Sequence, residues 1–248
     1  MYNILYGIDC IIFFMELIKS KLNNGLVFYA GDSEQPSIVP WLLGSFSSLN
    51  GRKNVLEMCA GNGAASFWCV DNGFKGTITL LDRREHVLSY AIKTIEENQL
   101  TGIECVCGNV KEFRSSKKYD AILCNPPFFS EYSVSKDDDL RAIRHEEGLT
   151  LELLCEAVTR SIKQKGHFYL CHTPSRFTEI VVALYSSKLE IKKIRFCRHT
   201  ASSLPFLVLI DAVYLGGKGV TVMPDFIVQD EAGNYTEEMK KMIERGCI

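Results

Sequence analysis

The segment best equipped for chemistry is Asn125-Pro126-Pro127-Phe128, which directly follows the apolar run Tyr119–Cys124. Two consecutive prolines fix φ at two positions and remove two N–H donors. A carbonyl, an amide side chain and an aromatic ring remain for a ligand. This set suits a planar amine, because Asn125 and the Pro126 carbonyl can accept its two protons while Phe128 stacks on its ring. Two in-plane acceptors would hold the amine nitrogen on line with an electrophile, which is catalysis by positioning and electrostatics.

A glycine-containing turn follows an earlier apolar run. Asn54–Met58 is predicted to be a strand, and residues 59–63 (CAGNG) lead from it into a predicted helix. Glycine is needed where backbone must approach a ligand closely or take a positive φ. The N-terminus of the helix that begins near Ala64 adds free N–H groups. Glycines in such a turn are structural as often as functional, so this motif alone is a modest signal.

A carboxylate ends the next β-branched run, Thr77–Leu81. Asp82 lies nineteen residues after Gly63, where a carboxylate can accept hydrogen bonds from both hydroxyls of a ribose. Together with the glycine turn it predicts a cofactor that contains adenosine. The third glycine of the nicotinamide-dinucleotide pattern is replaced by Ser66, which argues against that cofactor class. The alternative role for Asp82 is helix capping.

These motifs lie between runs that alternate between strand and helix patterns. Strands are predicted at residues 54–58, 77–81, 103–107, 119–124, 167–171, 191–197 and 206–214, and helices at 64–70, 84–98, 150–163, 176–187 and 236–244. This alternation predicts an α/β fold with a seven-stranded, mostly parallel sheet and helices on both faces. Thr150 is the expected N-cap of the third helix, and Lys165-Gly166 its end.

The N-terminal fifth of the chain follows a different pattern. Residues 1–24 are predicted to form an amphipathic helix closed by Asn23-Asn24-Gly25, and Trp41-Leu42-Leu43 a short helix. The expected organisation is therefore an N-terminal helical segment, residues 1–50, packed on or near the active site, and a catalytic domain over residues 51–248.

The composition is that of an ordinary globular protein. Its 248 residues, 46% hydrophobic and 23% charged, exclude a disordered, collagen-like or coiled-coil chain. A net charge of −2 excludes a protein that coats polyanions over its whole surface, although a local basic patch is compatible with it. Ten scattered cysteines without a C-x-x-C pair predict reduced thiols in the cytoplasm and no metal site. No apolar run approaches the about 20 residues of a spanning helix, so no membrane segment is expected.

The three chemical motifs together are similar to those of a known enzyme class. Glu57–Gly63, Asp82 and Asn125–Phe128 resemble the cofactor and catalytic motifs of S-adenosylmethionine-dependent amino-methyltransferases, which methylate adenine N6, guanine N2 or a glutamine amide. Residues 144–146, 166–168, 174–180 and 233–238 resemble the tRNA(Val) adenine-N6 methyltransferase family. The resemblance implies a Rossmann-like class I methyltransferase fold, S-adenosylmethionine as cofactor, and an RNA substrate, in particular a tRNA anticodon loop. A monomer or weak dimer is expected.

The same resemblance assigns roles to individual residues. It implies catalytic roles for Asn125, Pro126, Pro127 and Phe128, and cofactor contacts for Glu57, Cys59, Ala60, Gly61, Asn62, Gly63, Asp82, Arg83, Asn109, Val110 and Asn125. Glu57 and the glycine turn would hold the methionine part of the cofactor, and Asp82 its ribose. Asn109 stands where the family usually has an Asp that contacts the cofactor adenine. The segment Ser37–Leu43 likewise lacks an Asp that the family carries.

A basic segment indicates where RNA would bind. Ser186–Thr200 carries five Lys or Arg residues against one Glu, so its net charge is 5 − 1 = +4. This predicts an edge that contacts phosphates, and the alternative is a solvated strand pair. The expected substrate contacts are Phe129, Arg144, Arg176, Lys192, Lys193 and Arg195. For Arg176, a place at the start of a helix is the favoured interpretation.

Three other functions share parts of this pattern. A protein-glutamine methyltransferase would share Asn-Pro-Pro and usually has Tyr where this chain has Phe128. A guanine-N2 methyltransferase acting on rRNA would differ only in the base it modifies. A non-catalytic RNA-binding module would have kept the fold, but the intact tetrapeptide argues against it.

Overall fold

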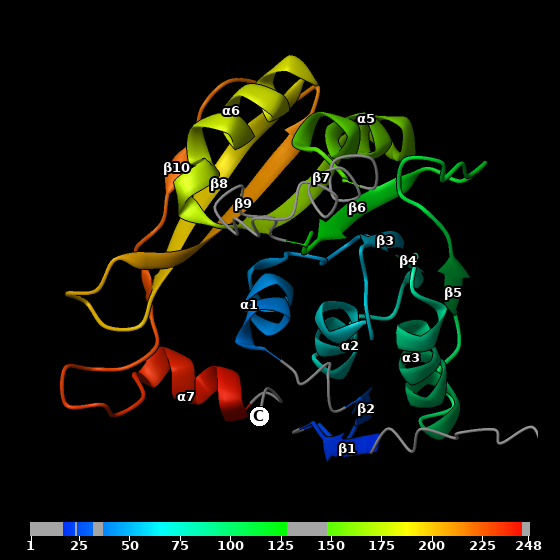
Figure 1. Ribbon diagram of the computed structural model, residues 1–248, viewed down its shortest axis with the longest axis horizontal. Coiled ribbons are helices and arrows are strands. Elements are labelled where there is room, and N and C mark those ends of the chain that lie inside the picture. Colours follow the sequence, from blue (N-terminus) through cyan, green and yellow to red (C-terminus); the bar gives the residue numbers. More distant parts are fainter. Residues whose placement is uncertain (1–16, 23, 32–36, 128–147, 245–248) are drawn as a thin grey trace, which may run out of the picture.

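The computed structural model describes residues 17–22, 24–31, 37–127 and 148–244. These residues form a large twisted sheet with helices on both faces, and a small two-stranded sheet beside it (Figure 1). Three residues predicted to contact substrate, Phe128, Phe129 and Arg144, lie outside the described residues.

The large sheet has the order β10-β8-β9-β7-β6-β3-β4-β5, and β11 also pairs with β8. Its strands are β3 (Asn54–Met58), β4 (Thr77–Asp82), β5 (Ile103–Cys107), β6 (Tyr119–Cys124), β7 (Ile162–His172), β8 (Leu189–Arg198), β9 (Pro205–Tyr214), β10 (Thr221–Val222) and β11 (Phe226–Ile227). Every pairing is parallel except the two that β9 makes with β7 and β8. The predicted α/β fold is confirmed, and the two-residue strands β10 and β11 extend the seven predicted strands.

Helices cover both faces of the sheet. They are α1 (Ile38–Phe46), α2 (Ala64–Asp71), α3 (Glu85–Glu97), α5 (Leu151–Ser161), α6 (Phe177–Ser186) and α7 (Glu237–Glu244). The first three lie on one face, and α5 and α6 lie on the other (Figure 1). Alternate side chains of each strand enter two separate cores, as the two-residue period of a strand requires: Ala121 packs beneath α1 and α2, and Ile122 beneath α5 and α6. No helix in the described part of the chain is long and apolar enough to cross a bilayer.

The N-terminal prediction is wrong where the structure describes it. Leu17–Lys21 is a strand, β1, that pairs antiparallel with β2 (Val27–Gly31). The Asn24-Gly25 pair belongs to the turn of this hairpin, in which Gly25 takes φ +105°. An Asn-Gly pair is a strong hairpin signal, and sequence analysis interpreted it as a helix end. The short helix predicted around Trp41 is confirmed as α1.

The junction between α5 and β7 also differs from the prediction. Thr150 caps α5 as expected, because its hydroxyl accepts a hydrogen bond from the backbone N–H of Leu153. However, α5 ends at Ser161 and β7 begins at once, rather than after Lys165-Gly166. That pair lies inside β7, where Lys165 takes φ +62° and the pairing with β6 shifts register. The residues interpreted as a helix end therefore form an irregularity within a strand.

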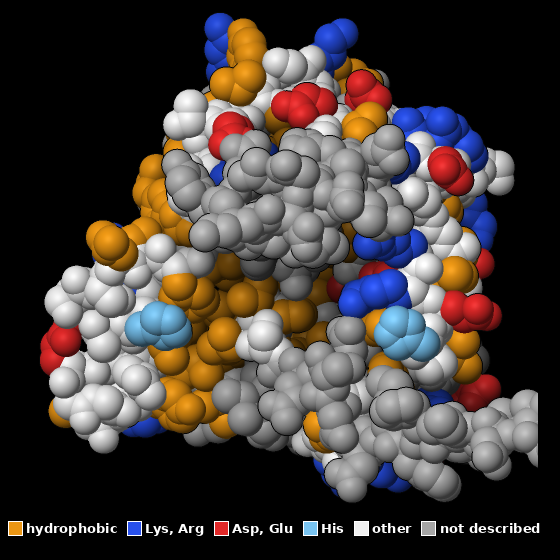
Figure 2. Space-filling model, viewed as in Figure 1, with side chains coloured by type: hydrophobic (Ala, Val, Ile, Leu, Met, Phe, Trp, Pro, Cys, Tyr) orange, Lys and Arg blue, Asp and Glu red, His pale blue; other side chains and the backbone are white. Residues whose placement is uncertain are grey.

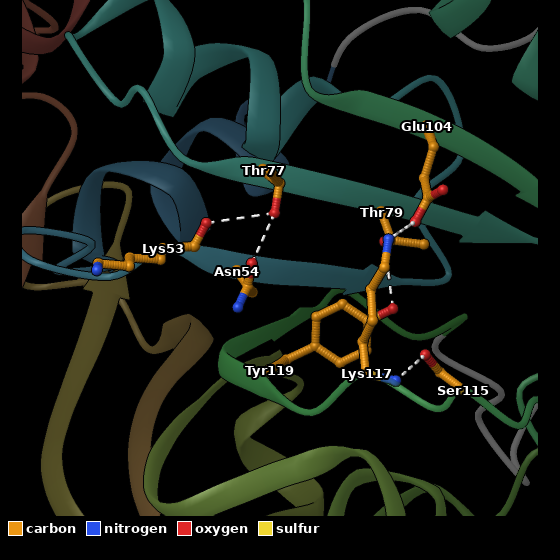
Figure 3. Close-up of polar contacts among 8 residues, drawn as sticks. All are labelled: Lys53, Asn54, Thr77, Thr79, Glu104, Ser115, Lys117 and Tyr119. Carbon is orange, nitrogen blue, oxygen red and sulfur yellow. Dashed lines mark hydrogen bonds and ion pairs between the residues drawn. The ribbon is translucent and has the colours of Figure 1, made fainter.

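Polar side chains tie the strands together near their amino ends (Figure 3). The hydroxyl of Thr77 on β4 donates to the side-chain oxygen of Asn54 on β3 at 2.9 Å. Further along β4, Thr79 donates to Glu104 of β5 at 2.7 Å and accepts from the buried hydroxyl of Tyr119 on β6 at 3.2 Å. The bonds of Thr79 satisfy its own buried hydroxyl and that of Tyr119, and they link β4 to β5 and β6, whereas the Thr77–Asn54 bond is exposed.

The strand order reverses between β3 and β6, which in open parallel sheets marks a ligand-binding crevice. The chain proceeds outward from β3 through β4 to β5, and then returns to place β6 on the other side of β3. In open parallel sheets, ligands bind at the carboxyl ends of the strands where the order reverses in this way. The carboxyl ends of β3 and β6 are that point here. The turn at residues 59–63 follows β3, and Asn125 follows β6.

Candidate functional site

Two buried carboxylates fix the turn that follows β3. Glu57 is 2% exposed, and its Oε2 accepts a hydrogen bond from the backbone N–H of Ser66 in α2 at 3.0 Å. Asp82, at the end of β4, is 4% exposed, and its Oδ2 accepts from the N–H of Gly61 at 2.7 Å. The turn is therefore held between the ends of two neighbouring strands and the first turn of a helix.

The two glycines of this turn have different reasons to be glycine. Gly63 takes φ +78°, and a Cβ there would lie 2.8 Å from Phe67 and 2.9 Å from Leu80, so close packing excludes a side chain. Gly61 takes φ +56°, but a Cβ there would meet nothing nearer than 3.7 Å. A methyl group at Gly61 would therefore make only ordinary contacts with Arg84 and Val87, whereas Gly63 serves the packing of α2.

The carboxyl group of Glu57 lies in an environment that disfavours its charge. Burial raises the pKa of Glu57 from 4.5 to about 7, and the negative charge of Asp82 adds to this rise. The hydrogen bonds from Ser66 lower the pKa and offset part of the effect. A positively charged group bound beside Glu57 would relieve this cost. The site therefore suits a ligand with a cationic end, such as the ammonium group of an amino acid.

The amide of Asn62 is a further polar group with unused capacity. Its residue is only 9% exposed, yet within the described residues its side chain has no hydrogen-bond partner. Buried amides normally have partners, so this one is available to a ligand in the turn. The neighbouring carboxylate of Asp82 accepts three bonds, from Gly61 and from the backbone and Nε of Arg84. A carboxylate can accept about four, which leaves capacity for a hydroxyl.

The other residues predicted to contact the cofactor lie around this crevice. Asn109 follows β5, and its Oδ1 accepts from the N–H of Lys111 at 3.0 Å, which makes a local turn. Val110 is buried in the core beneath α5 and α6. Arg83 is exposed next to Asp82. Thus the ends of β3, β4 and β5 bring the predicted cofactor residues to one edge of the sheet.

Asn125 lies beside this turn, at the end of the adjacent strand. Met58 of β3 pairs with Cys124 of β6, so the residues that follow them, Cys59 and Asn125, are neighbours across about 4.8 Å of strand spacing. The Oδ1 of Asn125 accepts a hydrogen bond from the thiol of Cys171 on β7 at 3.1 Å. Cys171 is fully buried, which raises the pKa of its thiol well above the usual value and keeps it a donor. Asn125 itself is half-buried, so its amide remains accessible.

Sequence analysis did not identify the Cys171 contact. The residue lies in an apolar strand, where cysteine is usually an inert core residue, and only the pairing of β6 with β7 places it against Asn125. All cysteines in the described ranges are free thiols. Within those ranges, no group of three or more His, Cys, Asp or Glu side chains is placed to hold a metal ion.

The basic residues predicted to contact RNA already have protein partners in several cases. Arg176 forms an ion pair with Glu179 at 2.6 Å and leads into α6, which agrees with the favoured helix interpretation. Lys192 donates to the backbone carbonyls of residues 217, 218 and 219. Arg195 pairs with Glu238 of α7 at 2.6 Å. Lys193 is exposed on β8. Contact between these residues and RNA stays a prediction.

A hollow lined with hydrophobic side chains opens over α1 (Figure 2). Ile38 and Val39, the first residues of α1, are only half-buried against the core. Because α1 leads to the amino end of β3, its first residues lie toward the opposite edge, where Asn125 lies. This edge of the sheet therefore offers apolar surface beside the polar groups of the crevice.

Comparisons with known proteins agree with this geometry. The tRNA1(Val) (adenine(37)-N6)-methyltransferase of Christiangramia forsetii is 25% identical over 82% of this chain and 86% of its own length. The enzyme of the same name from Shewanella sediminis is 24% identical over 82% of this chain and 87% of its own.

Among solved structures, a predicted O-methyltransferase from Agrobacterium tumefaciens superposes with a TM-score of 0.65 at 17% identity, over 84% of this chain and 97% of that one. This similarity confirms the predicted Rossmann-like fold. The sequence profile of the methyltransferase small domain matches residues 40–166, half of the chain, which covers β3 to β6 with both the glycine turn and Asn125. The chain therefore belongs to the methyltransferase small domain family.

Proposed function

We propose that this protein transfers a methyl group from S-adenosylmethionine to the exocyclic N6 amine of an adenine in RNA, in a tRNA anticodon loop. The observation that carries the proposal is the juxtaposition of Asn125 with the turn at residues 59–63 across one strand spacing. At that separation, a cofactor held by the turn and a planar amine held by Asn125 lie close enough for methyl transfer.

The residues of the crevice fit S-adenosylmethionine. Glu57 and the amide of Asn62, which has no partner among the described residues, suit the amino-acid end. The spare acceptor capacity of Asp82 suits the ribose hydroxyls. Because Gly61 has no side chain, a ligand can approach the backbone of the turn closely. The sulfonium of the bound cofactor supplies the methyl group as an electrophile, so no metal is required.

The residues after β6 prepare the acceptor. The Oδ1 of Asn125 and the carbonyl of Pro126 accept hydrogen bonds from the two N–H groups of the amine. Phe128, two residues after Pro126, stacks on the base. These contacts hold the nitrogen lone pair toward the methyl carbon, which lowers the entropic part of the barrier. The bound cofactor would give its methyl group to this nitrogen and remain as the neutral thioether, and the surplus amine proton would leave to water.

The choice of adenine in tRNA rests on the relatives. Both enzymes compared above are named for methylation of adenine 37 in tRNA1(Val), and each aligns with more than four-fifths of this chain. A base in a loop is reached at low cost, because it can be unstacked without breaking a duplex. Phe128, rather than Tyr, also favours a nucleobase over a glutamine amide.

Product analysis tests the proposal. The purified protein is incubated with methyl-labelled cofactor and separate tRNA, rRNA and protein fractions, and the labelled RNA is digested to nucleosides for mass spectrometry. N6-methyladenosine from tRNA is the expected product. N2-methylguanosine would show that the base is guanine, and label in the protein fraction would show a glutamine acceptor. Asn125→Ala is the matched control, because it should abolish label in every fraction without preventing cofactor binding.

A further inference from the structure

The loop that joins β8 to β9, residues 199–204, lies at the same edge of the sheet as Asn125. β7 is parallel to β6, and β8 runs parallel to β7 because β9 is antiparallel to both. The carboxyl end of β8 is therefore at the carboxyl edge of β6. Three strand spacings separate β6 from β8 in the sheet, which is about 14 Å.

Two aromatic rings are stacked at the base of this loop. The rings of His199 and Phe206 lie nearly parallel, with centroids 4.4 Å apart and an interplanar angle of 20°. Phe206 is partly buried and also packs against the core beneath α1 and α2. The imidazole of His199 is exposed, and it has no hydrogen bond within the part of the chain that is described. Phe206 therefore lies between the core and the exposed imidazole of His199.

The loop is held in a single shape by its own hydrogen bonds. The N–H of Thr200 donates to the Oγ of Ser203 at 3.1 Å, and that hydroxyl donates back to the carbonyl of Thr200 at 2.9 Å. The carbonyl of His199 accepts from the N–H of Gln229 at 2.8 Å. A surface fixed in advance loses little conformational entropy when a ligand binds. The stacked rings of His199 and Phe206, called the platform below, are thus already positioned for a flat ligand.

The platform offers no unpaired cation among the described residues next to it. Arg198 pairs with Asp225 at 2.5 Å, and Glu231, which accepts hydrogen bonds from the neutral Ser202, carries a negative charge. Leu204, in the same loop, is 87% exposed although its side chain is large and apolar. The recognition chemistry available here is therefore flat and apolar contact rather than phosphate neutralisation.

We propose that the His199–Phe206 pair is a stacking subsite for an unpaired base of the RNA other than the target adenine. The proposal rests on the proposed function for the identity of the ligand. Every base has a π-face, and stacking on an aromatic side chain is how single-stranded RNA is usually held. Across the sheet alone the separation is about 14 Å, and the register adds to it, because Leu209 of β9 pairs with Cys171 and Phe206 lies three residues farther on. Stacked bases are about 3.4 Å apart, so this base lies several nucleotides from the target.

Three single-residue variants test the subsite. His199→Ala should raise the Kd for a tRNA anticodon stem-loop about tenfold, the effect of losing one base–aromatic stack. His199→Phe keeps a flat ring and should bind at least as well as the unchanged protein. Tyr185→Ala removes an exposed aromatic residue, 78% exposed, from the C-terminal end of α6 at the opposite edge, and should leave Kd unchanged. Circular dichroism verifies that all three fold.

Two readouts separate stacking from other roles. The slope of log Kd against log salt should be the same for His199→Ala and the unchanged protein, because no phosphate contact is lost. Replacing one loop base at a time by an abasic site should weaken binding at a single position, and His199→Ala should abolish the penalty there. A changed salt slope, or equal Kd for His199→Ala and the unchanged protein, would overturn the subsite.

Binding is measured without methyl transfer, so the two proposals fail independently. If the RNA is methylated and the His199 variants bind equally, the subsite is wrong and the function stands. If RNA binds in a His199-dependent way but no N6-methyladenosine forms, the proposed function is wrong and the subsite stands.

Discussion

The thiol of Cys171 donates a hydrogen bond to the side-chain oxygen of Asn125 across 3.1 Å. That oxygen is the atom proposed to accept a proton of the target amine. An amide oxygen has two lone pairs, so it can accept from Cys171 on the buried side and from a substrate on the open side. Because a thiol that stays protonated favours the oxygen over the NH₂ group as its partner, Cys171 fixes which end of the amide faces it.

Removing this thiol should impair catalysis without affecting cofactor binding. Cys171→Ala loses one neutral hydrogen bond, and we expect kcat to fall up to about tenfold, while the Kd for cofactor is unchanged. Cys171→Ser keeps a donor and should recover most of the rate. Steady-state kinetics at saturating cofactor measure both. Equal kcat for the alanine variant and the unchanged protein would show that Asn125 is oriented by other contacts.

The acceptor group itself should matter far more. Asn125→Ala removes a proton acceptor from the amine, and we expect kcat to fall about 100-fold or more, as when a preorganised polar group is lost from an active site. Phe128→Ala should weaken turnover severely through the lost base stack. Both variants should bind cofactor normally by calorimetry. If either variant kept the full rate of methyl transfer at saturating cofactor, the proposed contacts of Asn125 and Phe128 with the amine and its base would be wrong.

The raised pKa of Glu57 predicts a pH-dependent stability. Below its ordinary pKa of 4.5 the group is protonated in the folded and unfolded states, and the stability associated with the raised pKa is fully present. This stability is lost as the pH rises through about 7. Glu57→Gln mimics the protonated acid, so it should raise the free energy of unfolding near pH 8.5 by on the order of 3 kcal/mol and change it little near pH 4.

Urea titrations of both proteins without cofactor, at the two pH values, provide the measurement. A constant difference between the proteins at both pH values would show that Glu57 does not titrate in this range. The same substitution should weaken cofactor binding above pH 7, because it removes the negative charge.

The two glycines of the turn should separate folding from binding. Gly63→Ala combines a left-handed backbone with overlap against Phe67 and Leu80, and should destabilise the fold by roughly 2–4 kcal/mol. Gly61→Ala has room for its methyl group and should cost only about 1 kcal/mol, but it places that group where the cofactor approaches. Thermal melts should therefore show a larger loss of stability for Gly63→Ala. Cofactor titrations should show that Gly61→Ala weakens cofactor binding.

Two basic residues of the segment predicted to contact RNA should behave differently. Arg195 forms an ion pair with Glu238 and lies over the ring of Phe226, so Arg195→Ala should destabilise the protein by roughly 1 kcal/mol. Lys193 is exposed, so if it meets a phosphate, Lys193→Ala should reduce the salt slope of RNA binding by about 1 without loss of stability. An unchanged salt slope would show that Lys193 does not contact a phosphate of the RNA.

The fold was largely predictable because its strands carry a simple pattern. Buried parallel strands such as Tyr119–Cys124 are apolar along their whole length, and the predicted bounds match the observed ones. The hairpin was missed because an Asn-Gly pair ends helices as well as turning hairpins, and only the docking of β2 on α3 decides between them. Local sequence carries no information about that docking.

The candidate site was predictable in part for a related reason. Glycines, a carboxylate at a strand end and Asn-Pro-Pro are local signals, and strand order alone brings them together. The contact between Cys171 and Asn125 joins residues on different strands, and the stacked pair of His199 and Phe206 spans a loop. The partners of Arg195 and Lys192 are equally remote in sequence. Such contacts depend on register, which an apolar pattern does not specify.

One helix links the N-terminal hairpin to the crevice. At the start of α3, the backbone N–H of Arg84 donates to Asp82. Asn98, 14 residues or about 21 Å further along, bonds both the N–H and the carbonyl of Val27. A truncation that deleted β1 and β2 would strip these partners from Asn98 and fray the far end of α3. Hydrogen exchange would then accelerate along the helix toward Asp82, so a protein shortened at its N-terminus would hold adenosine less firmly although every residue of the crevice was intact.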